Sequence, residues 1–231
     1  MKQLFLVLSL FVLTIVRTMA QTASPMVTFY DSENETTVEM SGGESQTMPA
    51  PLEIKMMANL EDYEGYTARC EWKLYNTRDG ESKPLLDRFD ENTSYTLLQS
   101  GSYGIKLYVM FTDRNGVELE YESEVFTINI TESKLSCPDG FSPNGDGIND
   151  VFKVTYQSII KMKGVFFNRW GQKVYSFDLT NVDEGWDGRQ GGKYVKDGVY
   201  YLNLQATGSD GVKYDIKKAV NVLKGFREYD E

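Results

Sequence analysis

The sequence predicts an all-β chain with two tandem antiparallel β-sandwich domains, and three observations support this prediction. Apolar residues alternate with polar ones in short runs, which is the pattern of strands that bury one face. The dipeptides Asn115-Gly116 and Asp210-Gly211 each separate two such runs and favour a tight hairpin turn. After residue 20, no amphipathic helix pattern of about ten or more residues occurs.

Residues 1–20 predict a cleaved secretory signal peptide. Lys2 precedes an apolar run at residues 4–16, and Thr18-Met19-Ala20 supplies small residues at the cleavage positions. The run has about 13 residues, whereas a membrane-spanning helix needs roughly 20. We therefore expect cleavage before Gln21, export across an inner membrane and no transmembrane span.

The first sandwich is expected at residues 51–135, after a loosely ordered leader at residues 21–50 that carries at most one edge strand. Ser, Thr, Glu and Gly dominate the leader, whereas strand patterns begin after residue 50. In the clearest strand every second residue is apolar, which places one face in the core. These residues are Tyr103, Ile105, Leu107, Val109 and Phe111. The returning strand changes phase near residues 123–125, which predicts a β-bulge.

The second sandwich is expected at residues 136–231, with the joint at about residues 132–140. Gly198-Val199-Tyr200 begins a strand, Asp210-Gly211 turns it, and the returning strand reaches Leu223. The first half has the same strand, turn and returning strand, and Gly101-Ser102-Tyr103 begins the strand before its turn. The last hairpin of an immunoglobulin-like sandwich has this arrangement. The predicted fold is therefore two tandem immunoglobulin-like domains after a signal peptide.

The first half resembles a polycystic-kidney-disease-type immunoglobulin-like domain in its layout. The resemblance rests on Glu71-Trp72-Lys73, Ser94-Tyr95-Thr96 and Gly101-Ser102-Tyr103. Trp72 is expected in the core between the sheets. Cys70 shares the buried face of the same strand, whereas Cys137 follows the last strand of this domain, toward the opposite end. Since a disulfide needs Cα atoms within about 7 Å, we expect two free thiols.

The residue inventory excludes several kinds of chemistry. The 231 residues contain no His and two Cys, which excludes Ser-His-Asp and Cys-His catalysis and His-ligated zinc. The net charge of -10 disfavours nucleic-acid binding. A glycosidase could use two carboxylates, for which Asp183, Glu184 and Asp187 are candidates, but solvated or capping roles explain them more simply. We expect a protein that is not an enzyme and uses no cofactor.

Four motifs in the second half carry the most specific signal. Their residues are Pro143, Asn144, Gly145, Asp146, Gly147, Asn149, Asp150, Asn168, Arg169, Trp170, Gly171, Trp186, Asp187, Gly188, Asp197, Gly198 and Tyr200. In this order and spacing they resemble the gliding-motility-associated C-terminal domain of Bacteroidetes, the type B sorting domain of type IX secretion, over about residues 138–223. The resemblance implies sorting by the type IX machinery and attachment to, or release from, the cell surface. It implies periplasmic residence where that machinery is absent, and partners in the machinery or the cell envelope.

The motif residues also predict local structure. Residues 142–150 are turn formers and predict an ordered loop capped by its own side chains. Residues 168–171 predict a hairpin turn whose aromatic ring folds onto the sheet, and Trp186-Asp187-Gly188 predicts a second aromatic-anchored turn. Calcium is the alternative for the loop, because its polar residues match EF-hand positions 3, 5, 6 and 9. Ser142 and Lys153 stand where that motif needs carboxylates at positions 1 and 12, so we expect a capped turn and no metal.

An alternative function is a surface module that binds a glycan or a protein through an aromatic platform. The candidates are Trp170, Trp186, Tyr194 and Tyr200. Each of them lies in or beside a strand or turn signal, so core packing is the simpler expectation. A platform needs ring faces that are open to solvent, and the structure distinguishes the two interpretations.

Overall fold

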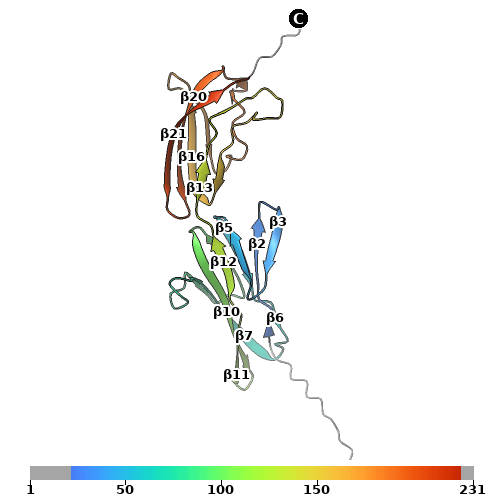
Figure 1. Cartoon of the computed structure of the whole chain (residues 1–231). Coiled ribbons are helices and arrows are strands. Elements are labelled where there is room, and N and C mark those ends of the chain that lie inside the picture. The colour runs from blue at the N-terminus through green and yellow to red at the C-terminus, as the bar shows by residue number, and fades with distance from the viewer. Residues whose placement is uncertain (1–21, 225–231) are drawn as a thin grey trace, which may run out of the picture.

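The computed structural model describes residues 22–224, and every regular element in this part of the chain is a β-strand. Figure 1 shows two domains that lie end to end, the first in blue to green and the second in yellow to red. The predicted signal peptide lies outside the described residues. Within residues 22–224, no helix is long and apolar enough to cross a membrane.

Two sheets face each other in the first domain. The larger has the order β4 (Ser45–Met48), β12 (Phe126–Ile130), β10 (Gly101–Asp113), β7 (Tyr66–Asn76) and β8 (Leu86–Arg88), and β11 (Glu118–Glu122) also pairs with β10. The smaller has the order β3 (Thr36–Met40), β2 (Met26–Asp31), β5 (Leu52–Met57) and β9 (Asn92–Leu97). A short pair, β1 (Thr22–Ala23) with β6 (Leu60–Glu61), completes the domain.

The core of the first domain lies between these two sheets. The alternating residues of β10 face inward, as expected, and Trp72 is fully buried among them. The Trp72 indole Nε1 donates a hydrogen bond to the Glu91 carbonyl oxygen at 3.2 Å. The expected irregularity near residues 123–125 is confirmed, because Ser123 Oγ replaces a strand partner by accepting the Leu107 N–H at 3.0 Å.

The prediction of a loose leader at residues 21–50 is wrong for the described residues. Four strands, β1 to β4, occupy this segment, and Val27, Phe29 and Met40 are buried in the core. β2 pairs with β5 inside the smaller sheet, whereas β3 and β4 are edge strands. Since an edge strand exposes much of its surface, β3 and β4 keep a polar composition that resembles a loop in the sequence.

The second domain has one five-stranded sheet, in the order β14 (Gly140–Phe141), β21 (Lys213–Val222), β20 (Gly198–Gly208), β16 (Ile159–Phe167) and β17 (Lys173–Asp178). Two short pairs accompany it, β13 (Lys134–Ser136) with β15 (Thr155–Gln157) and β18 (Arg189–Gln190) with β19 (Lys193–Tyr194). Loops at residues 142–154 and 179–197 contribute Phe152, Val182, Trp186 and Val195 to the core over its inner face.

The structure is thus all-β with sandwich-like sheets, as the sequence predicts. Two short pairs, β4 with β12 and β14 with β21, run parallel, which departs from the purely antiparallel sheets expected. The boundary also shifts, because β13 pairs with β15 and Leu135 packs on the second core. The second domain therefore begins at about residue 134, two residues before the predicted boundary.

Polar contacts hold the joint between the domains. Ser158 Oγ accepts the Ala50 N–H at 3.1 Å and lies 2.7 Å from Thr131 Oγ1. Ser209 Oγ donates to the Thr131 carbonyl oxygen at 3.1 Å. Both serines are buried, and Ile160 of β16 packs against the first core. Hydrogen bonds and apolar packing therefore join the two domains in addition to the covalent linker.

The two cysteines lie in separate domains. Cys70 is buried in the first core, and Cys137 is half-buried against the second; both are free thiols. Burial raises the pKa of the Cys70 thiol to about 11. Two free thiols were expected because the cysteines were placed toward opposite ends of the first domain, whereas in the structure Cys137 packs against the second core.

Candidate functional site

The first motif forms a closed loop around the Asp150 carboxylate. Asp150 Oδ1 accepts the N–H groups of Asn144 at 3.0 Å and Gly145 at 2.6 Å, and its Oδ2 accepts that of Gly147 at 2.7 Å. The N–H of Gly145, followed by that of Gly147, holds the pKa of this carboxyl below its ordinary value. The carboxylate therefore acts as the centre of the loop, with the backbone folded around it.

The other polar side chains of the loop form successive side-chain turns. Asn144 Oδ1 accepts the Asp146 N–H at 3.0 Å, and Asp146 Oδ1 accepts the Ile148 N–H at 2.8 Å. The predicted self-capped loop is confirmed by these bonds. No group of three or more His, Cys, Asp or Glu among residues 22–224 is arranged to hold a metal ion.

The second motif is the turn between β16 and β17. Asn168 Oδ1 accepts the N–H groups of Trp170 and Gln172, both at 3.0 Å, and Gly171 has a φ of 77° that favours glycine. The hairpin is thus confirmed, but the predicted position of its ring is wrong. Trp170 is 74% exposed, and the Arg169 guanidinium carbon lies 4.3 Å from its ring centroid. Because the tip extends past the end of β16, no core surface lies beneath the ring.

The third motif supplies the central residue of the second core. Trp186 is 1% exposed, and its ring stacks on Tyr175 at 5.8 Å with an interplanar angle of 11°. It also lies 4.6 Å from Phe166 and 5.5 Å from Tyr200, measured between ring centroids. Its Nε1 donates to the Arg189 carbonyl oxygen at 2.9 Å. The predicted aromatic anchor is confirmed, and the remaining motifs are arranged around it.

Gly188 and Gly185 bring the first and third motifs into contact. A Cβ on Gly188 would lie 2.9 Å from Pro143 Cγ, and Gly188 has a φ of 75°. A Cβ on Gly185 would lie 2.6 Å from the Phe152 carbonyl oxygen. Phe152 and Trp186 also exchange backbone hydrogen bonds of 2.9 and 3.0 Å. The backbones of the two loops therefore approach each other closely at Gly185 and Gly188, and a residue with a Cβ at either position would collide with the opposite loop.

The fourth motif begins β20 at the end of the domain away from the joint. Gly198 has a φ of 145°, and the Tyr200 hydroxyl donates to the Lys196 carbonyl oxygen at 2.8 Å. Asp197 Oδ1 lies 3.4 Å from Lys224 Nζ. Asp187 of the third motif accepts the Arg189 N–H at 3.0 Å and pairs with its guanidinium at 3.5 Å. These residues fix the ends of strands and turns.

The four candidate aromatics do not form one platform. Trp186 and Tyr200 are buried in the core, whereas Trp170 and Tyr194 are 74% and 43% exposed. An arginine covers one face of each exposed ring, Arg169 at 4.3 Å from Trp170 and Arg189 at 4.4 Å from Tyr194. The expectation of core packing is therefore confirmed for Trp186 and Tyr200 and wrong for Trp170 and Tyr194. The carboxylate candidate Asp183 lies at the surface and accepts the Tyr156 hydroxyl at 3.1 Å.

Sequence reasoning missed several residues on which the motifs depend. The rings of Phe141 and Tyr175 lie against Trp186, and the ring of Phe152 lies against Phe141. These residues lie in a two-residue strand, an edge strand and a loop, none of which has a clear period. Ser158 and Ser209 hold the joint, yet an isolated serine gives no pattern from which burial can be inferred. The available signal was the position of Phe141 and Phe152 at the two ends of the turn-rich loop.

Comparison with solved structures gives only distant similarities, of low overall superposition. The fibronectin(III)-like modules of Clostridium thermocellum CbhA are 14% identical, with 86% of this chain and 93% of that chain covered and a TM-score of 0.25. Dimeric latent PorU from Porphyromonas gingivalis is 12% identical, with coverage of 87% and 20% and a TM-score of 0.26. The FN1-FN3 domains of chicken CNTN1 are 10% identical, with coverage of 87% and 90% and a TM-score of 0.27. No relative was found among curated proteins.

The second domain has a specific family match. Residues 135–220 match the family model described as the CHU_C Type IX secretion signal domain. The matched range contains all four motifs and begins within β13, so it agrees with the structural limits of the domain. The second domain is therefore similar to a type IX secretion sorting signal, which indicates a secreted or cell-surface protein.

Proposed function

We propose that this chain is a non-enzymatic secreted or cell-surface protein whose second domain is the sorting signal recognised by the type IX secretion machinery. The first domain then serves as a spacer or interaction module. The observation that carries the proposal is the match of residues 135–220 to a type IX secretion signal domain. It is supported by the separate hydrophobic core of the second domain, which an exportable sorting unit requires.

The motif residues divide into a buried set and an exposed set, and the proposal assigns them different tasks. Trp186, Gly188 and Tyr200 build the core, so their effect on sorting acts through folding. Arg169 and Trp170 are exposed at the tip of a well-formed hairpin. A machine that reads a folded domain reads its surface, so we assign recognition to this exposed tip.

The first test separates the domains in a host that has the type IX machinery. A chain truncated after residue 131 lacks the sorting domain and should accumulate in the periplasm, whereas the full chain should reach the surface or the medium. A reporter placed between residues 1–21 and residues 132–231 should follow the full chain. Protease treatment of whole cells and fractionation of the medium measure this distribution.

The control is an isogenic host without a functional type IX machine, in which all three proteins should remain in the periplasm. An identical distribution of truncated and full chains in the competent host would mean that the second domain has the fold of a sorting domain but does not direct export.

The second test separates recognition from folding. The variant Arg169→Ala with Trp170→Ala should keep the melting temperature of the second domain and reduce the fraction that reaches the surface. Lys193→Ala, at an exposed position outside the motifs, is the matched control and should change neither value. Unchanged export of the double variant would exclude the hairpin tip as the recognised surface.

A further inference from the structure

The net charge is divided unequally between the two domains. Residues 21–133 contain 8 basic and 21 acidic side chains, a net charge of -13. Residues 134–231 contain 14 basic and 13 acidic side chains, a net charge of +1. The overall negative charge of the chain therefore comes from the first domain, whereas the second domain is close to neutral and carries its lysines on particular faces.

The acidic domain has a groove on the outer face of its larger sheet. The groove has a volume of about 840 Å³, and Phe89, Tyr108 and Met110 lie in its apolar part. Glu118, Glu120 and Glu122 line it from β11. These three carboxylates stand on the same face of the strand, about 7 Å apart from one to the next. Like charges at this spacing repel each other, so a partner with cations at the same spacing would stabilise them.

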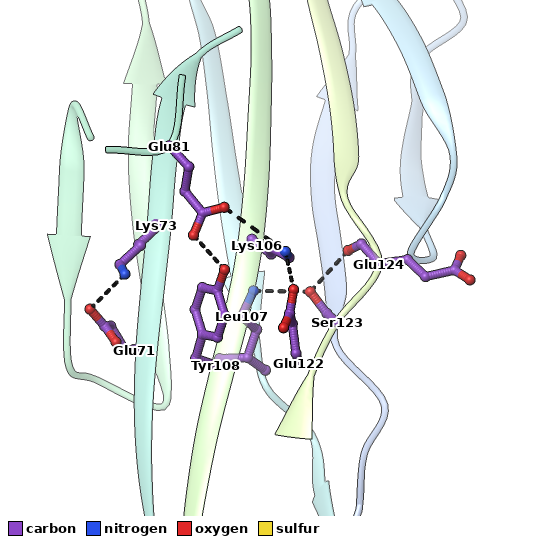
Figure 2. A network of polar contacts seen from close by, with 9 residues as sticks. All are labelled: Glu71, Lys73, Glu81, Lys106, Leu107, Tyr108, Glu122, Ser123 and Glu124. Atoms are coloured by element: carbon purple, nitrogen blue, oxygen red, sulfur yellow. Dashed lines mark hydrogen bonds and ion pairs between the residues drawn. The ribbon is translucent and has the colours of Figure 1, made fainter. Parts of the chain in front are cut away.

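The two lysines on this face are already engaged in ion pairs (Figure 2). Lys106 pairs with Glu122 and lies 3.9 Å from Glu81, which also accepts the Tyr108 hydroxyl. Lys73 pairs with Glu71 at 3.2 Å. Among residues 22–224, however, no basic side chain lies within ion-pair distance of Glu118 or Glu120. The outer half of the groove therefore keeps two carboxylates without an ion-pair partner, and Arg69 is the nearest cation in its lining.

The second domain presents a matching face, the outer surface of its five-stranded sheet. Lys161, Lys163 and Lys213 line a hollow of about 410 Å³ on this surface. Two carboxylates share the surface: Asp215 lines the hollow and pairs with Lys217 at 3.6 Å, and Asp178 is the strand neighbour of Lys163. No acidic group in the described part of the chain lies within ion-pair distance of these three lysines. Lys161 and Lys163 alternate along β16 and are therefore about 7 Å apart, the spacing of Glu118 and Glu120.

An apolar hollow continues from these lysines along the same face. It has a volume of about 470 Å³ and is lined by Phe167, Tyr201 and Asn203 among others. Asn203 Oδ1 is the one buried side-chain nitrogen or oxygen in residues 22–224 that lacks a hydrogen-bond partner. In the acidic groove, Arg69 and Phe89 lie side by side, with the guanidinium carbon 4.8 Å from the ring centroid.

We propose that these two faces bind each other between two copies of this chain, with the lysine face of β16 and β21 on the acidic groove of β11. The matched charges, the matched spacing and the apolar area beside each charge row select a second copy as the partner. The contact joins two different faces, so each copy carries one of each kind.

One copy cannot make this contact with itself. The Ser100 N–H donates to the Ser209 carbonyl oxygen at the joint, immediately before β10 begins at Gly101. Glu118 pairs with Thr112, eleven residues further along β10, which is about 37 Å from the joint at 3.4 Å per residue. Lys161 and Lys213 lie near the joint, on the other domain. Figure 1 accordingly shows β11 at the far end of the first domain.

Sedimentation velocity of residues 21–231 over a range of protein concentrations tests the proposal. At about 0.1 M salt the Debye length is about 10 Å, which screens the repulsion between whole molecules but leaves contacting ion pairs intact. At about 1 M salt it is about 3 Å, which weakens those pairs as well. We expect the sedimentation coefficient to rise with concentration at the lower salt and the rise to be lost at the higher.

Charge reversal identifies the faces. The variants Glu118→Lys with Glu120→Lys, and Lys161→Glu with Lys163→Glu, should each abolish association, whereas a chain with all four substitutions should regain it. The matched controls reverse two exposed charges elsewhere on each domain, Glu33→Lys with Glu39→Lys and Lys193→Glu with Lys196→Glu. They change the net charge equally and should leave association unchanged.

Melting curves establish that each variant is folded, and Lys161→Gln with Lys163→Gln replaces the lysine reversal if that variant is not. A monomer at all concentrations and salts would overturn the proposal. Association that the face variants and the controls affect equally, or that the fourfold variant does not regain, would overturn it too.

Discussion

At the scale of single residues, Trp186 and Trp170 show what a motif can and cannot specify. Both precede a turn residue in similar local sequence, and core packing was the expectation for both rings. In the structure Trp186 is 1% exposed and Trp170 is 74% exposed. The difference depends on what lies beneath each ring. Trp186 has the inner face of the sheet under it, whereas Trp170 stands past the end of its strand.

Replacing these two rings should therefore have very different effects. Trp186→Ala removes a buried indole and leaves a cavity among four aromatic rings, and should cost about 3–5 kcal/mol of unfolding free energy. Trp170→Ala changes an exposed side chain and should cost less than about 0.5 kcal/mol. Denaturant unfolding of the second domain measures both values. Equal effects would contradict the assignment of one ring to the core and one to solvent.

Asp150 should make the second domain sensitive to acid. Its backbone hydrogen bonds depress the folded-state pKa below the ordinary value of 3.8, so the folded state binds this proton less readily than the unfolded state. The resulting stabilisation is present above about pH 4 and is lost as the pH falls through the folded-state pKa. The melting temperature of Asp150→Asn should thus lie closer to that of the native chain at pH 2 than at pH 6. A constant difference across this range would exclude the charged carboxylate as the cause.

At the scale of elements, the sequence predicts strands with a buried alternating face and misses those at the edges. β10 and its turn were predicted because Tyr103 to Phe111 keep a strict period of two. β3 and β4 were not, because their polar side chains face solvent and the core needs only Met40 and a few half-buried residues from them. The same limit applies to the loops over the second sheet. Phe152 and Trp186 meet there through tertiary contacts that leave no local period.

The contact between the first and third motifs predicts a specific sensitivity at Gly188. Gly188→Ala adds a Cβ that would lie 2.9 Å from Pro143 Cγ, at a φ of 75°. Gly191→Ala is the matched control, because its φ is 60° and no atom lies within 4 Å of the added Cβ. Both pay the backbone cost of about 1 kcal/mol, and the difference between them measures the close approach.

We expect Gly188→Ala to be the more destabilising of the two by denaturant unfolding. Pro143→Ala should recover part of that difference when combined with Gly188→Ala, because it removes the ring that the new Cβ meets. If Pro143→Ala has the same effect in both backgrounds, the two loops are not coupled through this contact.

At the scale of the whole molecule, the joint was beyond prediction in its detail although its place was near the expected one. The end of one strand pattern and the start of the next place a boundary at about residues 132–140, and a boundary by itself suggests a flexible linker. The structure instead has two buried serines that receive or donate hydrogen bonds across it. Each serine is isolated in the sequence, and only the folded domains bring Ser158, Thr131 and Ser209 together.

These bonds predict that the joint serines fix the relative orientation of the domains. Ser158 Oγ serves the Ala50 N–H and the Thr131 hydroxyl, and Ser209 Oγ serves the Thr131 carbonyl oxygen. Removing both hydroxyls leaves buried polar groups unpaired, each at a cost of about 1–3 kcal/mol. Because the lost bonds run from serines of the second domain to groups of the first, rotation about the linker that admits water relieves the cost without unfolding either core. Ser158→Ala with Ser209→Ala should therefore broaden the distribution of interdomain distances between spin labels placed on β5 and β17, while the melting of each domain changes little.

Ser100→Ala is the matched control, since Ser100 contributes only its backbone N–H to the joint, and it should keep the narrow distribution. A narrow distribution in the double variant would mean that Ile160 and the backbone bond from Ser100 suffice to hold the orientation, and the hydroxyls would then have no part in fixing it.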